Sequence, residues 1–99
     1  MDNSKLNVLM SLKKSFQDQL DQIYVVEKEY NEKIKNLKDK YEHIKKNNIF
    51  GEEILKSLEL TIKFEESQLE NFKLYSKDSE KHYRKLLYMV NQLIEELTK

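Results

Sequence analysis

The sequence lacks cysteine, proline, alanine and tryptophan, and its 99 residues include one glycine, Gly51, and one arginine, Arg84. Without cysteine the chain has no disulfide and no cysteine-bound zinc. A single arginine argues against recognition of phosphate groups or base edges, which favours forked guanidinium groups. The 18 basic residues balance 18 acidic ones, so no net charge draws the chain to nucleic acid or to an anionic membrane.

Long hydrophobic runs are also missing. The longest, Leu86–Val90, is far too short to span a membrane. The stretch Met1–Lys5 carries an acid early and no sustained apolar segment, so it does not have the pattern of a Sec signal peptide. We therefore expect no membrane insertion. The sequence predicts a cytoplasmic protein, or one exported together with a partner by a route that uses no Sec signal.

Two heptad patterns, one in each half, dominate the sequence. Of 25 a and d positions between Leu6 and Leu97, 20 are apolar or tyrosine, about twice the number expected from a composition that is 38% hydrophobic. A charge-rich chain without proline and with such a repeat is typical of coiled coils and long helices. The polar exceptions are Lys13, Glu27, Glu65, Ser76 and Ser79.

The segment Asn47–Gly51 interrupts the two patterns and contains the only glycine. We therefore predict an all-α fold: an antiparallel two-helix coiled-coil hairpin forming a single domain over residues 1–99. The helices are expected at about 4–47 and 52–98, joined by a turn at 48–51. Lys45 and Lys46 before the turn, and Glu52 and Glu53 after it, suit the dipoles of the two helix ends.

Folding the second helix back on the first gives a definite register. When paired residue numbers add to 99, each a position meets a d position, so that Leu9 faces Val90 and Ile23 faces Ser76. This register centres the turn on Ile49 and Phe50, and Phe50 is placed to pack on Leu55 as a hydrophobic staple.

Several polar residues fall on the predicted seam between the helices. Glu65 is expected to reach Lys33 or Lys38 across the seam, whereas buried Lys13 and Glu27 would fix the register at a cost in stability. The stretch Ser76–Ser79 consists of poor helix formers and is a candidate for a kink or a break in the second helix.

Apolar residues outside the seam predict where a partner binds. They gather early in the first helix and late in the second, which an antiparallel hairpin brings to the same open end, away from the turn. The alternative is that they are scattered surface residues, which any protein carries. The predicted partner-binding residues are Val8, Leu12, Val25, Leu87 and Ile94 at the open end, with Leu60, Phe64 and Leu74 as a second, outer set.

The sequence offers no constellation for catalysis or for cofactor or metal binding. His43 and His82 each follow an aspartate by four residues, a spacing seen in metal sites but also in ordinary exposed helix pairs. The lysines between residues 28 and 46 are interrupted by acids and predict a solvated helix face. We therefore expect no enzyme activity, no cofactor, no metal and no nucleic acid.

In length, helical layout, midpoint glycine and lack of a Sec signal, the whole chain resembles the small helical proteins of type VII secretion systems. At the turn the sequence reads Ile49-Phe50-Gly51, without the tryptophan of the Trp-x-Gly hairpins that are themselves exported. The export signal Tyr-x-x-x-Asp/Glu is not met at Tyr75, Tyr83 or Tyr88, and no Phe-x-x-x-Asp is present. The resemblance therefore implies an accessory protein that pairs with the helical N-terminal domain of an LXG-type toxin, or with a second small helical protein, and targets the toxin for secretion.

Two functions remain open from the sequence. The first is a non-enzymatic helical adaptor or chaperone-like protein that binds another helical protein; the second is a self-associating coiled-coil scaffold, a homo-oligomer. Both use the same heptads. Gly51→Ala should separate a hairpin from one continuous helix, with a loss of stability in the hairpin if Gly51 requires a backbone geometry that only glycine adopts easily.

Overall fold

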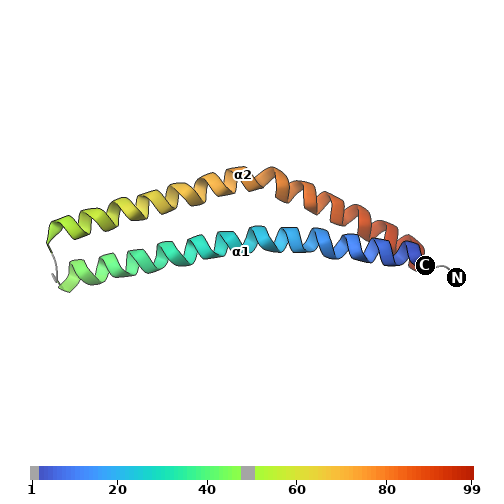
Figure 1. Cartoon of the computed structure of the whole chain (residues 1–99), viewed down its shortest axis with the longest axis horizontal. Helices are drawn as coiled ribbons and strands as arrows, with labels where there is room; N and C mark the ends of the chain where they lie inside the picture. Colours follow the sequence, from blue (N-terminus) through green and yellow to red (C-terminus); the bar gives the residue numbers. More distant parts are fainter. Residues whose placement is uncertain (1–2, 48–50) are drawn as a thin grey trace. The chain divides into compact units, whose positions relative to one another are not determined.

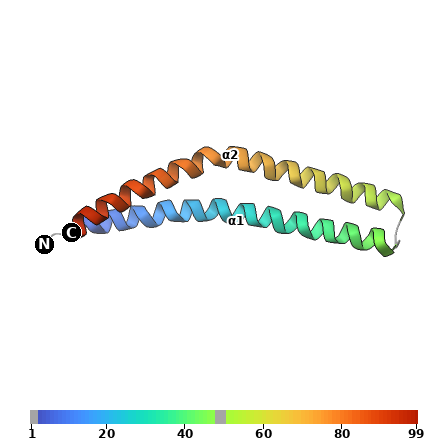
Figure 2. The same ribbon diagram turned by 180° about the vertical axis from the view of Figure 1, so that it is seen from behind.

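The computed structural model describes residues 3–47 and 51–99, which form two long helices and no strand. Helix α1 spans Ser4–Asn47 and helix α2 spans Glu52–Thr98, against predicted ranges of about 4–47 and 52–98. The helices pack antiparallel, so that the start of α1 lies beside the end of α2 in both views (Figure 1, Figure 2). The all-α hairpin is therefore confirmed, whereas the centre of the predicted turn and the staple from Phe50 fall outside the described residues.

Contacts divide the chain into two compact units, each of which contains part of both helices. The terminal unit consists of Met1–Val25 and Tyr75–Lys99, and the turn-side unit consists of Val26–Leu74. The assignment of all 99 residues to a single domain stays a prediction.

The turn-side unit follows the predicted seam. Ile34, Ile62 and Leu69 are buried at predicted a and d positions, and the rings of Tyr30 and Phe72 lie 6.1 Å apart between centroids. Such apolar burial on one stripe of each helix is what holds a two-helix unit together.

Ion pairs confirm the register of this unit. Lys33 Nζ lies 2.9 Å from Glu65 Oε1, as expected, whereas Lys38 pairs with Glu66 instead, at 3.7 Å. Glu27, half-buried, lies 4.0 Å from Lys73. The numbers of the residues in the Lys33 and Glu27 pairs add to nearly 99, which agrees with the predicted pairing.

The terminal unit keeps the predicted seam on α1 but not on all of α2. Phe16 lies against Tyr83, with ring centroids 6.2 Å apart, and Leu20, Ser76 and Val90 are buried. Lys13, which was expected in the seam, is exposed, so this expectation is wrong.

After Ser76 the seam of α2 shifts by one position. Ser79 is exposed, and the buried or half-buried positions that follow Ser76 are Glu80, Tyr83, Leu86, Leu87, Val90 and Ile94. The spacing from Leu69 through Phe72 and Ser76 to Glu80 is three, four and four residues, which is the pattern of a stutter, an insertion of four residues into a heptad repeat. The predicted d positions at 79 and 93 are therefore wrong, and the one at 86 is half-buried beside the buried Leu87, because the prediction continues the heptads of the turn-side unit past this insertion.

Poor helix formers at Ser76–Ser79 do not divide α2, which is one helix from Glu52 to Thr98. Ser76 is 7% exposed, and every buried side-chain nitrogen or oxygen in the described part of the chain has a hydrogen-bond partner. The Ser76 hydroxyl, which can both donate and accept, is therefore accommodated with a hydrogen-bond partner inside one continuous helix.

The ends of the helices next to the turn carry favourable charges. Lys45 and Lys46 lie in the last turn of α1, and Glu52 and Glu53 lie in the first turn of α2. Gly51 directly precedes α2 in the N-cap position. Its φ lies outside the left-handed region, and a Cβ placed there would meet no atom within 4 Å. Gly51→Ala was expected to destabilise the hairpin only if this residue required a backbone geometry reserved for glycine, and that condition is not met.

Gly51→Asp is accordingly expected to raise the free energy of unfolding by about 0.5–1 kcal/mol, since it adds an N-cap acceptor and restricts the unfolded chain. Gly51→Ala adds no acceptor and should change the free energy of unfolding by much less. Urea titrations followed by circular dichroism at 222 nm would measure both variants. A clear loss of stability in both would show that the site is strained after all.

Candidate partner-binding surfaces

Most of the predicted partner-binding residues lie on the surface of one unit or the other. Val8, Leu12 and Val25 are exposed on α1 in the terminal unit. Leu60, Phe64 and Leu74 are each at least 59% exposed on α2 in the turn-side unit. Covering large apolar side chains of this exposure with a partner removes apolar surface from water and so stabilises the complex.

Leu87 and Ile94 are placed differently from the expectation. Leu87 is 9% exposed and belongs to the core, and Ile94 is half-buried, whereas Leu93, predicted in the seam, is 47% exposed. The stutter after Ser76 causes this exchange, because it turns the residue after each predicted d position toward α1. The exposed apolar surface of this unit therefore includes Leu93 and Met89, and not Leu87.

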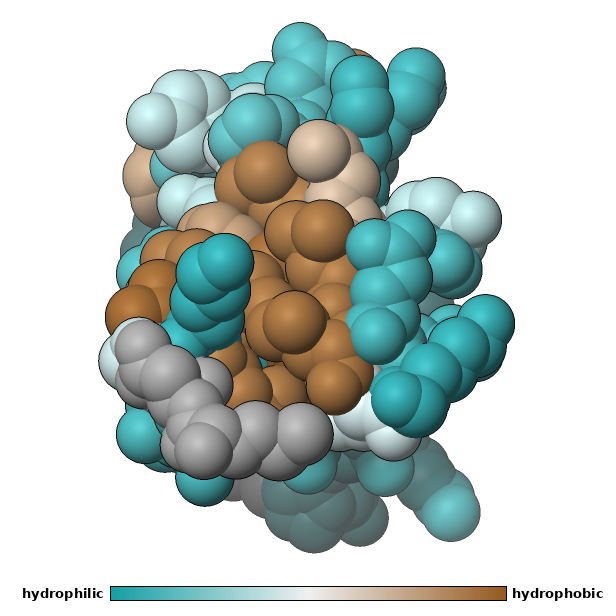
Figure 3. All heavy atoms as spheres, turned by 90° about the vertical axis from the view of Figure 1, so that its right-hand side faces the viewer, coloured by the Kyte–Doolittle hydropathy of each residue, from teal (hydrophilic) through white to brown (hydrophobic). Residues whose placement is uncertain are grey.

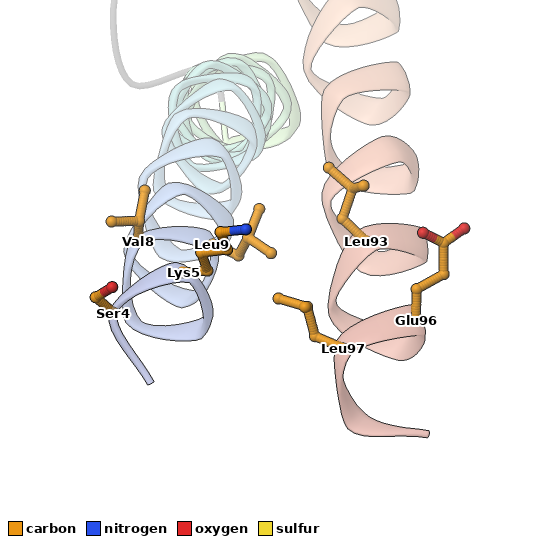
Figure 4. A pocket seen from close by; sticks show the side chains of 7 residues that line it. All are labelled: Ser4, Lys5, Val8, Leu9, Leu93, Glu96 and Leu97. Carbon is orange, nitrogen blue, oxygen red and sulfur yellow. The ribbon is translucent and has the colours of Figure 1, made fainter. Parts of the chain in front are cut away.

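Apolar side chains gather on the end of the terminal unit where α1 begins and α2 ends, with hydrophilic side chains around them (Figure 3). A groove of about 520 Å³ opens here between the two helices. Its apolar lining comes from Val8 and Leu9 on α1 and from Leu93 and Leu97 on α2 (Figure 4). We call this surface the open-end groove.

The open-end groove carries one charge on each wall. Lys5 lines the wall formed by α1 and Glu96 lines the wall formed by α2. Both are exposed, and among the ion pairs found in residues 3–47 and 51–99 none joins these two side chains. Sequence reasoning did not include this pair, since neither residue is apolar or part of a motif.

A polar cluster lies on the other edge of the seam in the terminal unit. Tyr24 donates a hydrogen bond to Glu80 Oε1 at 3.1 Å, and the guanidinium of Arg84 donates to the Tyr24 hydroxyl and lies 2.7 Å from the Glu80 carboxylate. The hydrogen bond that Arg84 donates to the Tyr24 hydroxyl, together with the charge of Glu80, raises the pKa of Arg84 above its usual value, so this guanidinium group stays a cation at neutral pH. At this edge polar side chains connect the two helices, whereas the open-end groove has a mainly apolar lining.

The outer set of the turn-side unit forms a row along α2. Leu60 and Phe64 are four residues apart and share one face of the helix, and Leu74 lies ten residues further on. Leu60 and Leu74 are 68% and 66% exposed. A row of this kind is the surface that an amphipathic helix presents to a partner helix.

His43 hydrogen-bonds within its own helix, with Nδ1 3.2 Å from Asn47 Nδ2. In the described residues no group of three or more His, Cys, Asp or Glu side chains gathers that could hold a metal ion. Nor does either described helix have the length and apolarity needed to cross a membrane.

Comparisons of the chain with protein-family models, with curated proteins and with solved structures found no match.

Proposed function

We propose that this chain is a non-enzymatic helical adaptor, which binds the helices of another protein through apolar side chains left exposed on its two-helix units. The observation that carries this proposal is the row Leu60, Phe64 and Leu74, whose members are each at least 59% exposed on one helix. Two-helix units have thin cores, and small scaffolds of this kind usually gain stability from a partner. Binding would cover these side chains and complete a bundle of three or four helices.

The partner we propose is the helical N-terminal domain of an LXG-type toxin, or a second small helical protein of the same secretion system. Support comes from the resemblance in length and layout to type VII accessory proteins. The lack of both export motifs favours a chain that acts together with a signal-bearing partner.

A double variant, Leu60→Ser with Phe64→Ser, is expected to weaken binding to this partner at least about tenfold, because it removes two of the three apolar side chains of the outer set. Titration calorimetry of the full chain with the helical N-terminal domain of an LXG-type toxin would measure the effect. Both side chains are exposed in the unbound chain, so its helicity should be unchanged.

The matched control replaces two exposed charged residues of the same helix, Lys56→Ser with Glu70→Ser. This variant should bind as the unaltered chain does. Equal loss in both variants, or no heat of binding with the unaltered chain, would contradict the adaptor proposal.

A self-associating scaffold is the second candidate. It is favoured by the 3–4 spacing that α1 maintains over 44 residues, which other copies could continue. A scaffold requires association that grows with concentration beyond a fixed stoichiometry, whereas an adaptor forms a complex of defined size. Sedimentation over a hundredfold concentration range distinguishes the two.

A further inference from the structure

Each helix of the terminal unit carries a second row of residues beside the one that forms the seam. The members of this second row are spaced three and four residues apart, as in the seam itself. On α1 they are Lys5, Val8 and Leu12, and on α2 they are Met89, Leu93 and Glu96, all of them exposed. Since the first row of each helix already packs within the chain, the second is available for another helix.

The two second rows match each other in antiparallel register. Phe16 lies against Tyr83 in this unit, which puts Lys5 nearly level with Glu96 and Val8 nearly level with Leu93. The rows therefore offer a charge opposite its complement and apolar residues opposite apolar ones. Within one chain Lys5 and Val8 lie on one wall of the open-end groove, and Leu93 and Glu96 lie on the other (Figure 4).

We infer that a second copy of this chain docks on the open-end groove, about a two-fold axis parallel to the helices of the terminal unit, to form a four-helix bundle. This axis places the α1 wall of each copy against the α2 wall of the other, at the same level along the helices. Lys5 then meets Glu96 of the second copy, and the reciprocal pair forms on the other side. Val8 meets Leu93, and Leu12 meets Met89.

Charge complementarity is what favours a second copy over a foreign helix. A foreign helix needs an acid and a base placed to suit both walls, whereas this chain supplies both at the required level. The neighbouring helices of the bundle are also antiparallel, so the positive start of α1 lies beside the negative end of α2 of the other copy. The other edge of the seam is occupied by the polar contacts of Tyr24, Glu80 and Arg84, and the two-fold axis uses the groove of each copy once, so the contact closes as a dimer.

This dimer goes beyond the adaptor function, because it leaves Leu60, Phe64 and Leu74 in the turn-side unit free for a partner. The inference and the proposed function can fail separately: one concerns the oligomeric state of the purified chain alone, and the other its binding to a different protein.

Sedimentation equilibrium of the full chain at 1–200 µM should show a reversible monomer–dimer equilibrium with no larger species. Masses should lie between that of the chain, 12.0 kDa, and twice that value. A monomer throughout this range overturns the inference, and so does a trimer or an open-ended series.

Charge exchange tests the orientation. Lys5→Glu and Glu96→Lys should each weaken the dimer about tenfold, since each converts two exposed ion pairs into two repulsive pairs. Both changes improve the match of the charge to the dipole of its own helix, because the first turn of α1 contains no acid and the last turn of α2 contains no base. The helicity of the two variants should therefore hold or rise while dimerisation weakens.

Mixing the two single variants gives the decisive result. In a heterodimer the carboxylate introduced at position 5 of one copy faces the ammonium group introduced at position 96 of the other. The second pair consists of the unaltered Lys5 and the unaltered Glu96, so that all the pairs are attractive again. Sedimentation of the mixture should recover the dimer affinity that each variant loses alone. If mixing restores nothing, or if both variants dimerise as the unaltered chain does, the proposed orientation is wrong.

Apolar variants test the groove itself. Leu93→Ser should abolish most of the dimer at 50 µM with unchanged helicity, because this side chain is already 47% exposed in the single chain. Leu60→Ser, outside the groove, should leave the dimer intact. The reverse outcome would move the interface to the outer set and overturn the inference.

Discussion

Leu20→Ala is expected to lower the free energy of unfolding by about 2–4 kcal/mol, which is the usual cost of removing a large side chain from a well-packed position. Leu20 has the lowest exposure of the core side chains, 4%. Single cores of this size rarely supply more than about 3–5 kcal/mol in total. The variant should therefore lose most of the helical structure of the terminal unit at 25 °C, as measured by circular dichroism in a urea titration.

The control for this variant is the same substitution at an exposed leucine. Leu60→Ala removes the same atoms from a side chain that is 68% exposed and should change the free energy of unfolding by less than about 0.5 kcal/mol. If Leu20→Ala costs no more than Leu60→Ala, the seam described for α1 is incorrect.

Glu65→Leu is expected to have a large effect of the opposite sign. Glu65 is 8% exposed at a seam position between Ile62 and Leu69, and its carboxylate lies 2.9 Å from the ammonium group of Lys33, whose side chain is 60% exposed. Replacing a buried ion-pair member by an apolar residue of similar size often stabilises a protein, by about 1–3 kcal/mol here, because the desolvation penalty disappears. Thermal and urea unfolding of the variant would measure the gain.

Lys33→Met should do the reverse. It removes the partner but leaves the carboxylate of Glu65 in the seam, at a cost of about 1–3 kcal/mol for the unsatisfied group. In the Glu65→Leu background the same change should cost little, since no buried charge then depends on Lys33. A double-mutant cycle that shows no coupling between these positions would contradict this account of the seam.

Much of the fold could be predicted from the sequence because the heptads are nearly uninterrupted. Along α1, apolar or tyrosine side chains stand at 10 of the 12 predicted seam positions, and their flanks are polar, so one face is plainly favoured. The ion pair between Lys33 and Glu65 followed from the same register. Lys13 was wrong because a long, flexible lysine near the open end can turn its ammonium group to water.

The second half of α2 could not be assigned by hydrophobicity alone. Leu86 and Leu87 are adjacent, as are Leu93 and Ile94, so two neighbouring heptad tracks are both apolar there. An α-helix with 3.6 residues per turn drifts by about 20° per heptad from a strict seven-residue repeat, and an insertion of four residues corrects the drift. Packing against α1 favours the set of positions that includes Leu87. The stutter itself falls at Ser79 and Glu80, which are both polar, so hydrophobicity did not predict it.

The stutter also separates the surface residues that were placed correctly from those that were not. Val8, Leu12, Val25, Leu60, Phe64 and Leu74 lie exposed because they fall where the seam is regular. Leu87 and Ile94 were misplaced because they lie beyond the stutter. The charged rim of the open-end groove could not be predicted, since it depends on which residues stand level across two helices. Partner binding by any of these residues stays a prediction.

The antiparallel register also orders the events of folding. Lys33 and Glu65 are separated by a far shorter stretch of chain than Phe16 and Tyr83, and the entropy lost on closing a loop grows with its length. We therefore expect the turn-side unit to form before the terminal unit. The groove that we assign to a second copy thus lies in the unit that we expect to form last, so association with that copy would stabilise the last step of folding.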